Sequence, residues 1–201
     1  APEGVEVTVG ELGDLRSLTQ FSDGLEVCFH YAARASFKGD WRKFEVTNVF
    51  GTENLVSACQ DVPRFVYCST QAVVLEDRDI VNGDESLAEP KEFIDHYSKS
   101  KAMAEQIVIG GHAGGTVIRP PWVWGAGDTN NLPTLIKPTL EGRMGYFDDG
   151  KNLLETLHVA NLVHAGCVAA ERIESCGQVY FVTDDEPVSS KGFSNAVLVA
   201  C

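Results

Sequence analysis

A tyrosine and a lysine four residues apart, Tyr97 and Lys101, have the side chains and the spacing for proton transfer. Asp95 fits an N-cap and no Gly or Pro follows before Gly110, so the sequence predicts a helix over 96–108. On a helix the two side chains lie one turn apart on the same face. An ammonium beside a phenol favours the phenolate and lowers its pKa from the ordinary value of about 10. Such a tyrosine can exchange a proton with an alcohol or carbonyl oxygen, although the same pair also occurs on solvated helix faces.

Alternating apolar segments surround this helix and indicate the fold. Short apolar runs predict strands at 5–9, 25–31, 64–68, 116–119, 153–159 and 178–183. Between them the patterns predict helices at 14–21, 38–59, 132–141 and 158–172, and a long acidic loop at 74–95. Such alternation is typical of an α/β fold, here a doubly wound parallel sheet of the Rossmann-like type.

Small, hydroxyl-bearing or ring-locked residues follow three of these strands. They are Ala32–Ala33, Ser69–Thr70 and Pro120–Pro121. In open α/β sheets ligands bind at the carboxyl ends of the strands, so the three segments are expected to share one crevice near the start of the Tyr97 helix. Ser69 and Thr70 can equally cap a turn.

Composition limits the partners. The formal net charge of −13 argues against nucleic acid or an anionic membrane surface. No apolar run is long enough to cross a bilayer, and no signal peptide opens the chain. The six cysteines form no C-x-x-C pair and mostly lie in apolar segments, which favours reduced thiols in a cytoplasmic protein. No cluster of residues has metal-ligand spacing, so we expect no metal.

Several segments, taken in order, resemble the extended short-chain dehydrogenase/reductase superfamily over nearly the whole chain. They are Gly10–Leu12, Phe29–Ala33, Asn48–Thr52, Phe65–Thr70, Tyr97-x-x-x-Lys101, Arg119–Asp128 and Leu157–Leu162. Within that superfamily, Asn82–Leu87, Asp95–Ser98 and His158-Val159-x-Asn161 are most similar to the 3β-hydroxysteroid dehydrogenase/isomerase group and its sterol-dehydrogenase-like relatives.

The resemblance implies catalytic roles at matching positions. Tyr97 would be the general acid/base, and Lys101 would lower its pKa and hold the nicotinamide ribose. Thr70 would hydrogen-bond the reacting oxygen, with Ser69 as second choice, and Asn48 would brace the site from the helix at 38–59.

The resemblance also implies NAD or NADP as cofactor, with NAD favoured. The residues implied to contact it are Glu11, Leu12, Tyr31, Ala32, Ala33, Asn48, Cys68, Tyr97, Lys101, Pro120 and Val123. The implied partner is a small-molecule substrate, and homodimerisation would use the helices at 38–59 and 95–109.

The sequence departs from the family pattern in several places. Glu11 stands where the family usually has Asp, Ala160 replaces a frequent Asp, and Trp124 a frequent Tyr. The G-x-x-G-x-x-G loop that binds a pyrophosphate is absent, and Gly110–Gly115 cannot replace it because it follows a helix and precedes a strand.

We therefore expect residues 1–201 to be an incomplete NAD(P)-binding Rossmann-like domain that lacks the first β-α-β unit. Part of the substrate-binding lobe would lie at about 128–158 and 184–201. The chain is interpreted as a fragment of a longer parent, whose membrane association through an absent region stays open.

Three functions remain as hypotheses. The first is an NAD(P)-dependent oxidoreductase acting on a secondary alcohol or ketone, such as a 3β-hydroxysteroid. The second is a nucleotide-sugar epimerase or dehydratase, although Gln71–Ala72 stands where dehydratases carry an Asp-Glu pair. The third is a non-catalytic truncated remnant, which the missing pyrophosphate loop suggests.

Overall fold

A computed structural model describes residues 3–36 and 38–200, which form two compact units. Unit 1 runs to Arg119 and takes in Val168–Tyr180, and unit 2 comprises Pro120–Cys167 and the residues from Phe181 onward. Among the described residues, no helix combines the length and the apolar character that a bilayer crossing requires.

A four-stranded sheet forms the centre of unit 1. Its strands are β1 (Val27–His30), β2 (Arg64–Cys68), β3 (Gly115–Arg119) and β7 (Val179–Phe181), in the order β1-β2-β3-β7. Both β1–β2 and β2–β3 are parallel, with His30 opposite Tyr67 and Cys68 opposite Ile118. The predicted parallel sheet is therefore confirmed, and the carboxyl ends of β1, β2 and β3 lie at one edge.

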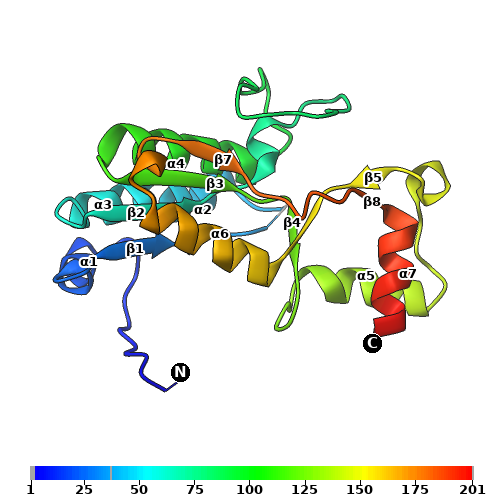
Figure 1. Cartoon of the computed structure of the whole chain (residues 1–201), viewed down its shortest axis with the longest axis horizontal. Helices are drawn as coiled ribbons and strands as arrows, with labels where there is room; N and C mark the ends of the chain where they lie inside the picture. The colour runs from blue at the N-terminus through cyan, green and yellow to red at the C-terminus, as the bar shows by residue number, and fades with distance from the viewer. Residues whose placement is uncertain (1–2, 37, 201) are drawn as a thin grey trace. The chain divides into compact units, whose positions relative to one another are not determined.

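Unit 1 also contains helices (Figure 1). They are α1 (Leu15–Ser22), α2 (Trp41–Phe44), the π-helix η1 (Glu45–Phe50), α3 (Gly51–Ala58), the short 3₁₀-helices η2 (Gln71–Val74) and η4 (Ile173–Ser175), and α4 (His96–Gly111). Of these, α4 packs against β2 and β3, and α3 and η1 in turn pack against α4. The helix expected at 38–59 begins at Trp41, because the Asp40 side chain caps it by accepting from the Arg42 amide.

Glycines mark two close approaches in unit 1. A Cβ on Gly51 would lie 2.8 Å from Leu12 Cβ, so close packing against Leu12 explains why a glycine stands inside this helical stretch. A Cβ on Gly114 would lie 2.1 Å from the Pro63 carbonyl oxygen. The Gly-rich segment 110–115 is thus a tight connection between α4 and β3.

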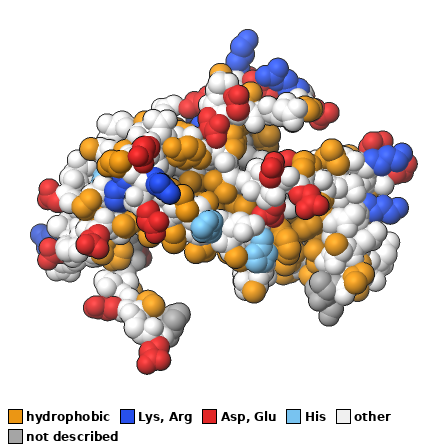
Figure 2. All heavy atoms as spheres, viewed as in Figure 1, with side chains coloured by type: hydrophobic (Ala, Val, Ile, Leu, Met, Phe, Trp, Pro, Cys, Tyr) orange, Lys and Arg blue, Asp and Glu red, His pale blue; other side chains and the backbone are white. Residues whose placement is uncertain are grey.

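The strand predicted at 5–9 does not form. Val5, Val7 and Val9 are 55%, 67% and 92% exposed, and the segment extends away from β1 (Figures 1 and 2). Alternation of apolar and polar residues is a local property, whereas a strand requires a neighbour for its backbone groups. Among the described strands none pairs with this segment.

Unit 2 contains two small sheets. One pairs β4 (Trp122–Trp124) with β6 (Thr156–His158) in parallel, and the other pairs β5 (Leu153–Leu154) with β8 (Val188–Ser189) antiparallel. Its helices are α5 (Asn131–Leu140), the 3₁₀-helix η3 (Phe147–Gly150), α7 (Ser190–Ala200) and most of α6 (Val159–Glu171). The strand expected at 153–159 is therefore broken between β5 and β6, and β4, β8 and α7 were not predicted.

Candidate active site

The first turn of α4 fixes the position of Tyr97. The Asp95 carboxylate accepts from the Ser98 amide at 2.7 Å, and the Ser98 hydroxyl in turn lies 3.4 Å from the Asp95 amide. This reciprocal capping box satisfies two amides that the helix cannot pair internally. The predicted N-cap and helix start are confirmed.

Lys101 is buried at the carboxyl end of β2. Its side chain is 1% exposed, its Nζ donates to the Cys68 carbonyl oxygen at 2.6 Å, and Nζ lies 4.1 Å from the centre of the Tyr67 ring. Burial lowers the pKa of Lys101 to about 8, while the nearby Cys68 and Glu105 act in the opposite direction. The ammonium is therefore the main form at neutral pH.

Tyr97 has the opposite pKa shift from the one predicted. Burial raises the pKa of its phenol above the ordinary value, and the charges of Cys68 and Asp95 raise it further. Spacing alone suggested that Lys101 would lower this pKa, but spacing does not report desolvation. Cys68, at the end of β2, acts electrostatically on both Tyr97 and Lys101, and its carbonyl oxygen accepts the hydrogen bond from Lys101.

Asn48 connects two elements beside this cluster. Its Nδ2 donates to the Ser100 hydroxyl at 2.8 Å, and that hydroxyl donates to the Tyr97 carbonyl oxygen at 2.7 Å. Its Oδ1 accepts from the Arg34 amide at 2.7 Å. One buried amide thus links α4 to the loop that follows β1.

The π-helical turn that carries Asn48 is held by a buried hydrogen-bond chain. The Thr52 hydroxyl donates to the Asn48 carbonyl oxygen at 2.6 Å, and His30 Nε2 lies 2.9 Å from the same hydroxyl oxygen. Because the Thr52 proton is used, His30 must donate from Nε2. Burial, helped by the charge of Lys101, lowers the pKa of His30 to about 3 and keeps the ring neutral.

The two predicted hydroxyls differ in their contacts. Thr70 Oγ1 accepts from the Ala72 amide at 3.2 Å and caps η2. Ser69 is 3% exposed, and its Oγ has no hydrogen-bond partner among the described residues. The roles assigned to Thr70 and, as second choice, to Ser69 stay predictions; Ser69 is the one of the two whose hydroxyl is without a partner in the part of the chain that the structure describes.

The remaining predicted cofactor contacts belong to both units. In unit 1, Glu11, Tyr31 and Ala32 are exposed, Ala33 is half-buried, and Leu12 packs against Gly51. In unit 2, Pro120 is buried and Val123 pairs with Leu157.

Residues of unit 1 fit one end of a nicotinamide nucleotide. Ala32 and Ala33 carry no side chain beyond Cβ after β1, Lys101 supplies a buried ammonium, and Ser69 a buried hydroxyl. A ribose needs such hydrogen-bonding groups, and a flat ring needs a close approach to the backbone. The sequence holds no G-x-x-G-x-x-G loop for the pyrophosphate.

A buried ion pair that was not predicted from the sequence joins Arg119 to Glu105, which stands one helical turn after Lys101 on α4. Arg119 Nε lies 3.0 Å from Glu105 Oε1, and Arg119 Nη2 lies 2.6 Å from Glu105 Oε2. Both side chains are under a tenth exposed. The repeated spacing of four residues, Tyr97–Lys101–Glu105, was the signal available for Glu105.

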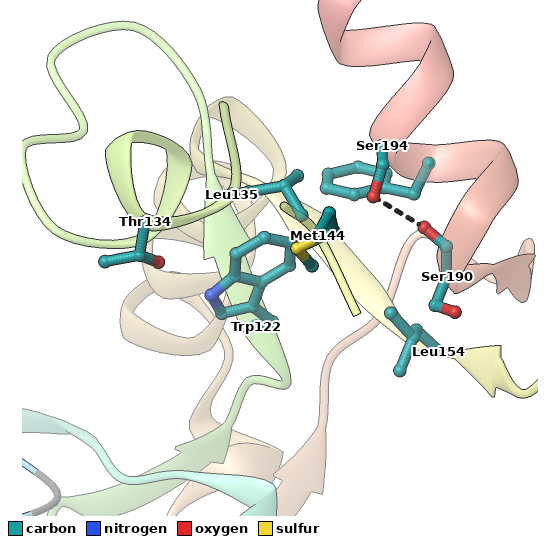
Figure 3. A pocket seen from close by; sticks show the side chains of 8 residues that line it. Trp122, Thr134, Leu135, Met144, Leu154, Ser190 and Ser194 are labelled. Atoms are coloured by element: carbon teal, nitrogen blue, oxygen red, sulfur yellow. Dashed lines mark hydrogen bonds between the residues drawn. The ribbon is translucent and has the colours of Figure 1, made fainter. Parts of the chain in front are cut away.

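A second candidate site is an open, largely apolar pocket of about 270 Å³ in unit 2 (Figure 3). It is lined by Trp122, Thr134, Leu135, Met144, Leu154, Ser190, Phe193 and Ser194. Phe193 packs edge-on against Trp122, with ring centres 5.2 Å apart. The lining has no charged side chain, and its few hydroxyls are already donating, as Ser194 does to the Ser190 carbonyl oxygen at 2.8 Å. This chemistry suits a neutral apolar group.

Comparison with known sequences identifies relatives of this chain. The model of the 3-beta hydroxysteroid dehydrogenase/isomerase family matches residues 3–200. A farnesyl-dihydroquinoline-oxide ketoreductase from Stigmatella aurantiaca is 37% identical over 97% of this chain and 60% of its own length. A 3-beta-hydroxysteroid dehydrogenase from Mycolicibacterium neoaurum is 36% identical over 96% and 58%. The chain thus spans about 60% of the length of these relatives.

Solved structures share the fold. An epimerase from Methanothermobacter thermautotrophicus superposes with a TM-score of 0.86 at 18% identity, covering 100% of this chain and 64% of that one. A dTDP-glucose 4,6-dehydratase from Streptomyces venezuelae with bound NAD gives a TM-score of 0.80 at 21% identity, covering 100% and 65%. At these identities the likeness confirms the Rossmann-like α/β fold.

Proposed function

Because the chain belongs to the 3-beta hydroxysteroid dehydrogenase/isomerase family, we propose that it carries the catalytic core of an NAD(P)-dependent oxidoreductase. The reaction is the interconversion of a secondary alcohol and a ketone. One observation carries the proposal: the buried Lys101 ammonium, one helical turn after Tyr97 on α4, donates to the Cys68 carbonyl oxygen at the carboxyl end of β2, where the next residue, Ser69, has a buried hydroxyl without a partner among the described residues.

The protonation states of the site suit reduction of a carbonyl. A nicotinamide bound beside these residues would supply or accept the hydride. Tyr97, whose pKa burial raises, holds its proton at neutral pH and donates it to the carbonyl oxygen. The Lys101 ammonium stabilises the phenolate that results, and Ser69 or Thr70 hydrogen-bonds the reacting oxygen.

We propose an apolar substrate of the 3β-hydroxysteroid or sterol type. The charge-free pocket of unit 2 supports an apolar substrate, and relatives named as a 3-beta-hydroxysteroid dehydrogenase and a sterol-4-alpha-carboxylate 3-dehydrogenase support the steroid or sterol type. A nucleotide sugar carries phosphates, which cations or amides bind, and the chain lacks the Asp-Glu pair after Thr70 that a dehydratase would use. The chain spans about 60% of the length of its relatives, and the substrate is therefore proposed for the protein as a whole.

A Tyr97→Phe variant tests the proposed role. We expect reduction of a 3-ketosteroid to fall by about 10²-fold or more, because acid–base catalysis contributes 10²–10⁴-fold. Cofactor binding, followed by NADH fluorescence, should be unchanged. Tyr180→Phe, at a partly exposed tyrosine in β7, is the matched control. Unchanged turnover in Tyr97→Phe would refute the role.

The cofactor and the alternatives are tested on the unaltered protein. NADH and NADPH titrations decide between the two cofactors, with NAD expected. A panel of 3-ketosteroids and UDP- or dTDP-sugars, scored by turnover and thermal shift, should respond to the steroids alone. Response to the sugars would support an epimerase or dehydratase, and failure to bind either dinucleotide would support a non-catalytic remnant.

The pH profile tests the role of Lys101. Its pKa is lowered to about 8, so the ammonium is present below that pH and is lost above it. The rate of carbonyl reduction should therefore fall as the pH rises through about 8, and Lys101→Met should be slow at every pH. A flat profile from pH 6.5 to 9.5 would contradict dependence on the ammonium.

A further inference from the structure

The Glu105–Arg119 ion pair joins the middle of α4 to the carboxyl end of β3. Three donor–acceptor distances of 2.6–3.2 Å make it bidentate, and it is buried on both sides. Burying two charges costs several kcal/mol per ion before their attraction is counted, so a buried pair is weak evidence for stability. A role in positioning or charging a neighbour is the better explanation.

The neighbour is Lys101. Glu105 follows it by four residues on α4, which puts the two side chains on one helix face. Glu105 acts on Lys101 electrostatically and favours its ammonium. The Nε and Nη2 groups on one edge of the Arg119 guanidinium meanwhile donate to both carboxylate oxygens and hold the carboxylate in a fixed orientation.

We propose that Glu105, held by Arg119, is a positioning residue that keeps Lys101 charged inside the protein. The proposal rests on the proposed function for its catalytic meaning, because Lys101 is the residue through which the pair would act. Without the carboxylate, a lysine that is 1% exposed would have only desolvation acting on its ammonium from this side.

Other groups face Lys101 and set the background. Cys68 also favours the ammonium, but burial raises the pKa of this thiol to about 11, so it carries no charge at neutral pH. His30 stays neutral, and Tyr67, which offers its ring face to Nζ, has a raised phenol pKa. Of the groups that the structure places around Lys101, Glu105 is thus the carboxylate that offsets its charge.

The test follows Lys101 directly by NMR, using its ¹³Cε resonance from pH 5 to 11 in the complete chain. Glu105→Gln keeps the shape and removes the charge, and we expect the Lys101 titration midpoint to fall by about one pH unit or more. Glu89→Gln removes an exposed carboxylate that contacts Gln106 on α4 and should leave the midpoint unchanged.

A second variant guards against a trivial loss of folding. Glu105→Gln leaves Arg119 as a buried cation, whereas Glu105→Gln with Arg119→Met removes both charges and should fold while still lowering the midpoint. An unchanged midpoint in both variants would overturn the proposal. So would loss of the fold in both variants but not in Glu89→Gln, because the pair would then serve packing alone.

Activity separates this proposal from the proposed function. The falling limb of the pH–rate profile should move to lower pH in Glu105→Gln, with kcat affected more than KM. A shifted Lys101 midpoint in a protein that reduces no ketone would sustain the positioning role and reject the oxidoreductase. A shifted midpoint with an unshifted rate profile in an active enzyme would remove Glu105 from catalysis and overturn its part in the reaction.

Discussion

Some buried residues near the candidate active site have pKa values far from their ordinary ones, and His30 is the clearest case. The ring is 2% exposed and donates to Thr52, which in turn holds the carbonyl of Asn48. Its pKa falls from about 6.5 to about 3 through burial. A neutral imidazole here supports the π-helical turn without placing a second cation beside Lys101.

This shift makes stability depend on pH. In the unfolded chain His30 binds a proton below about pH 6.5, whereas in the native chain it does so only below about pH 3. The free energy of unfolding therefore falls as the pH falls between these values. Between pH 7.5 and 5 the loss from this residue is about 2 kcal/mol. Urea unfolding at both values should show a smaller loss in His30→Gln, whose amide can still donate to Thr52.

His164→Gln, at an exposed histidine, is the control for that measurement. It should keep the full loss of stability between the two pH values. If His30→Gln lost as much stability on acidification as the unaltered chain, the neutral buried imidazole would be contradicted.

At the scale of elements, the join between η1 and α3 depends on Gly51. The Gly51 amide reaches back five residues to the Val46 carbonyl oxygen, and the Gly51 backbone lies against Leu12. A π-helical turn changes the direction in which its side chains point. In η1 the Asn48 side chain donates a hydrogen bond to the Ser100 hydroxyl. The glycine thus lets the segment after residue 10 approach the helix that carries a site residue.

Gly51→Ala should destabilise the chain by about 1–3 kcal/mol, because the new Cβ would meet Leu12 Cβ at 2.8 Å. Gly110→Ala, near the end of α4, meets nothing within 4 Å and should stabilise by up to about 1 kcal/mol through helix propensity. Equilibrium urea unfolding gives both values. Equal gains in the two variants would show that the approach to Leu12 is not tight.

Elements with strong local signals were predictable from the sequence. The run at 64–68 is apolar and becomes a central strand at those bounds, and the Asp95 cap marks the start of α4. The strands of unit 2 were missed or broken because runs of two or three residues are defined by their partners, as β5 is by β8. A pattern that is local cannot supply those partners.

The site was predictable in part for the same reason. The resemblance placed Tyr97, Lys101 and Asn48, and the structure gathers them around α4. Arg119 was not linked to Glu105, because their contact requires β3 to lie beside α4, a tertiary fact. The raised pKa of Tyr97 follows from burial, which spacing does not encode.

At the scale of the whole molecule, the edge that β1 forms within the described sheet is a surface liability of this chain. Among the described strands β1 pairs with β2 alone, and Phe29 and Tyr31 beside that edge are 46% and 39% exposed. Exposed apolar edge strands pair with other chains. The net charge of −13 opposes such contacts between copies, and salt screens that repulsion.

We therefore expect the chain to associate with itself more strongly as salt rises from 0.05 to 0.5 M. Phe29→Lys puts a charge beside the bare edge and should reduce that association, measured by sedimentation velocity over a range of concentrations. Val81→Lys, at a valine 80% exposed in the segment between η2 and α4, adds the same charge elsewhere and should not. Either lysine changes the net charge from −13 to −12 and so weakens the repulsion between copies; an equal rise of association in both variants would therefore show that net charge rather than the β1 edge governs it.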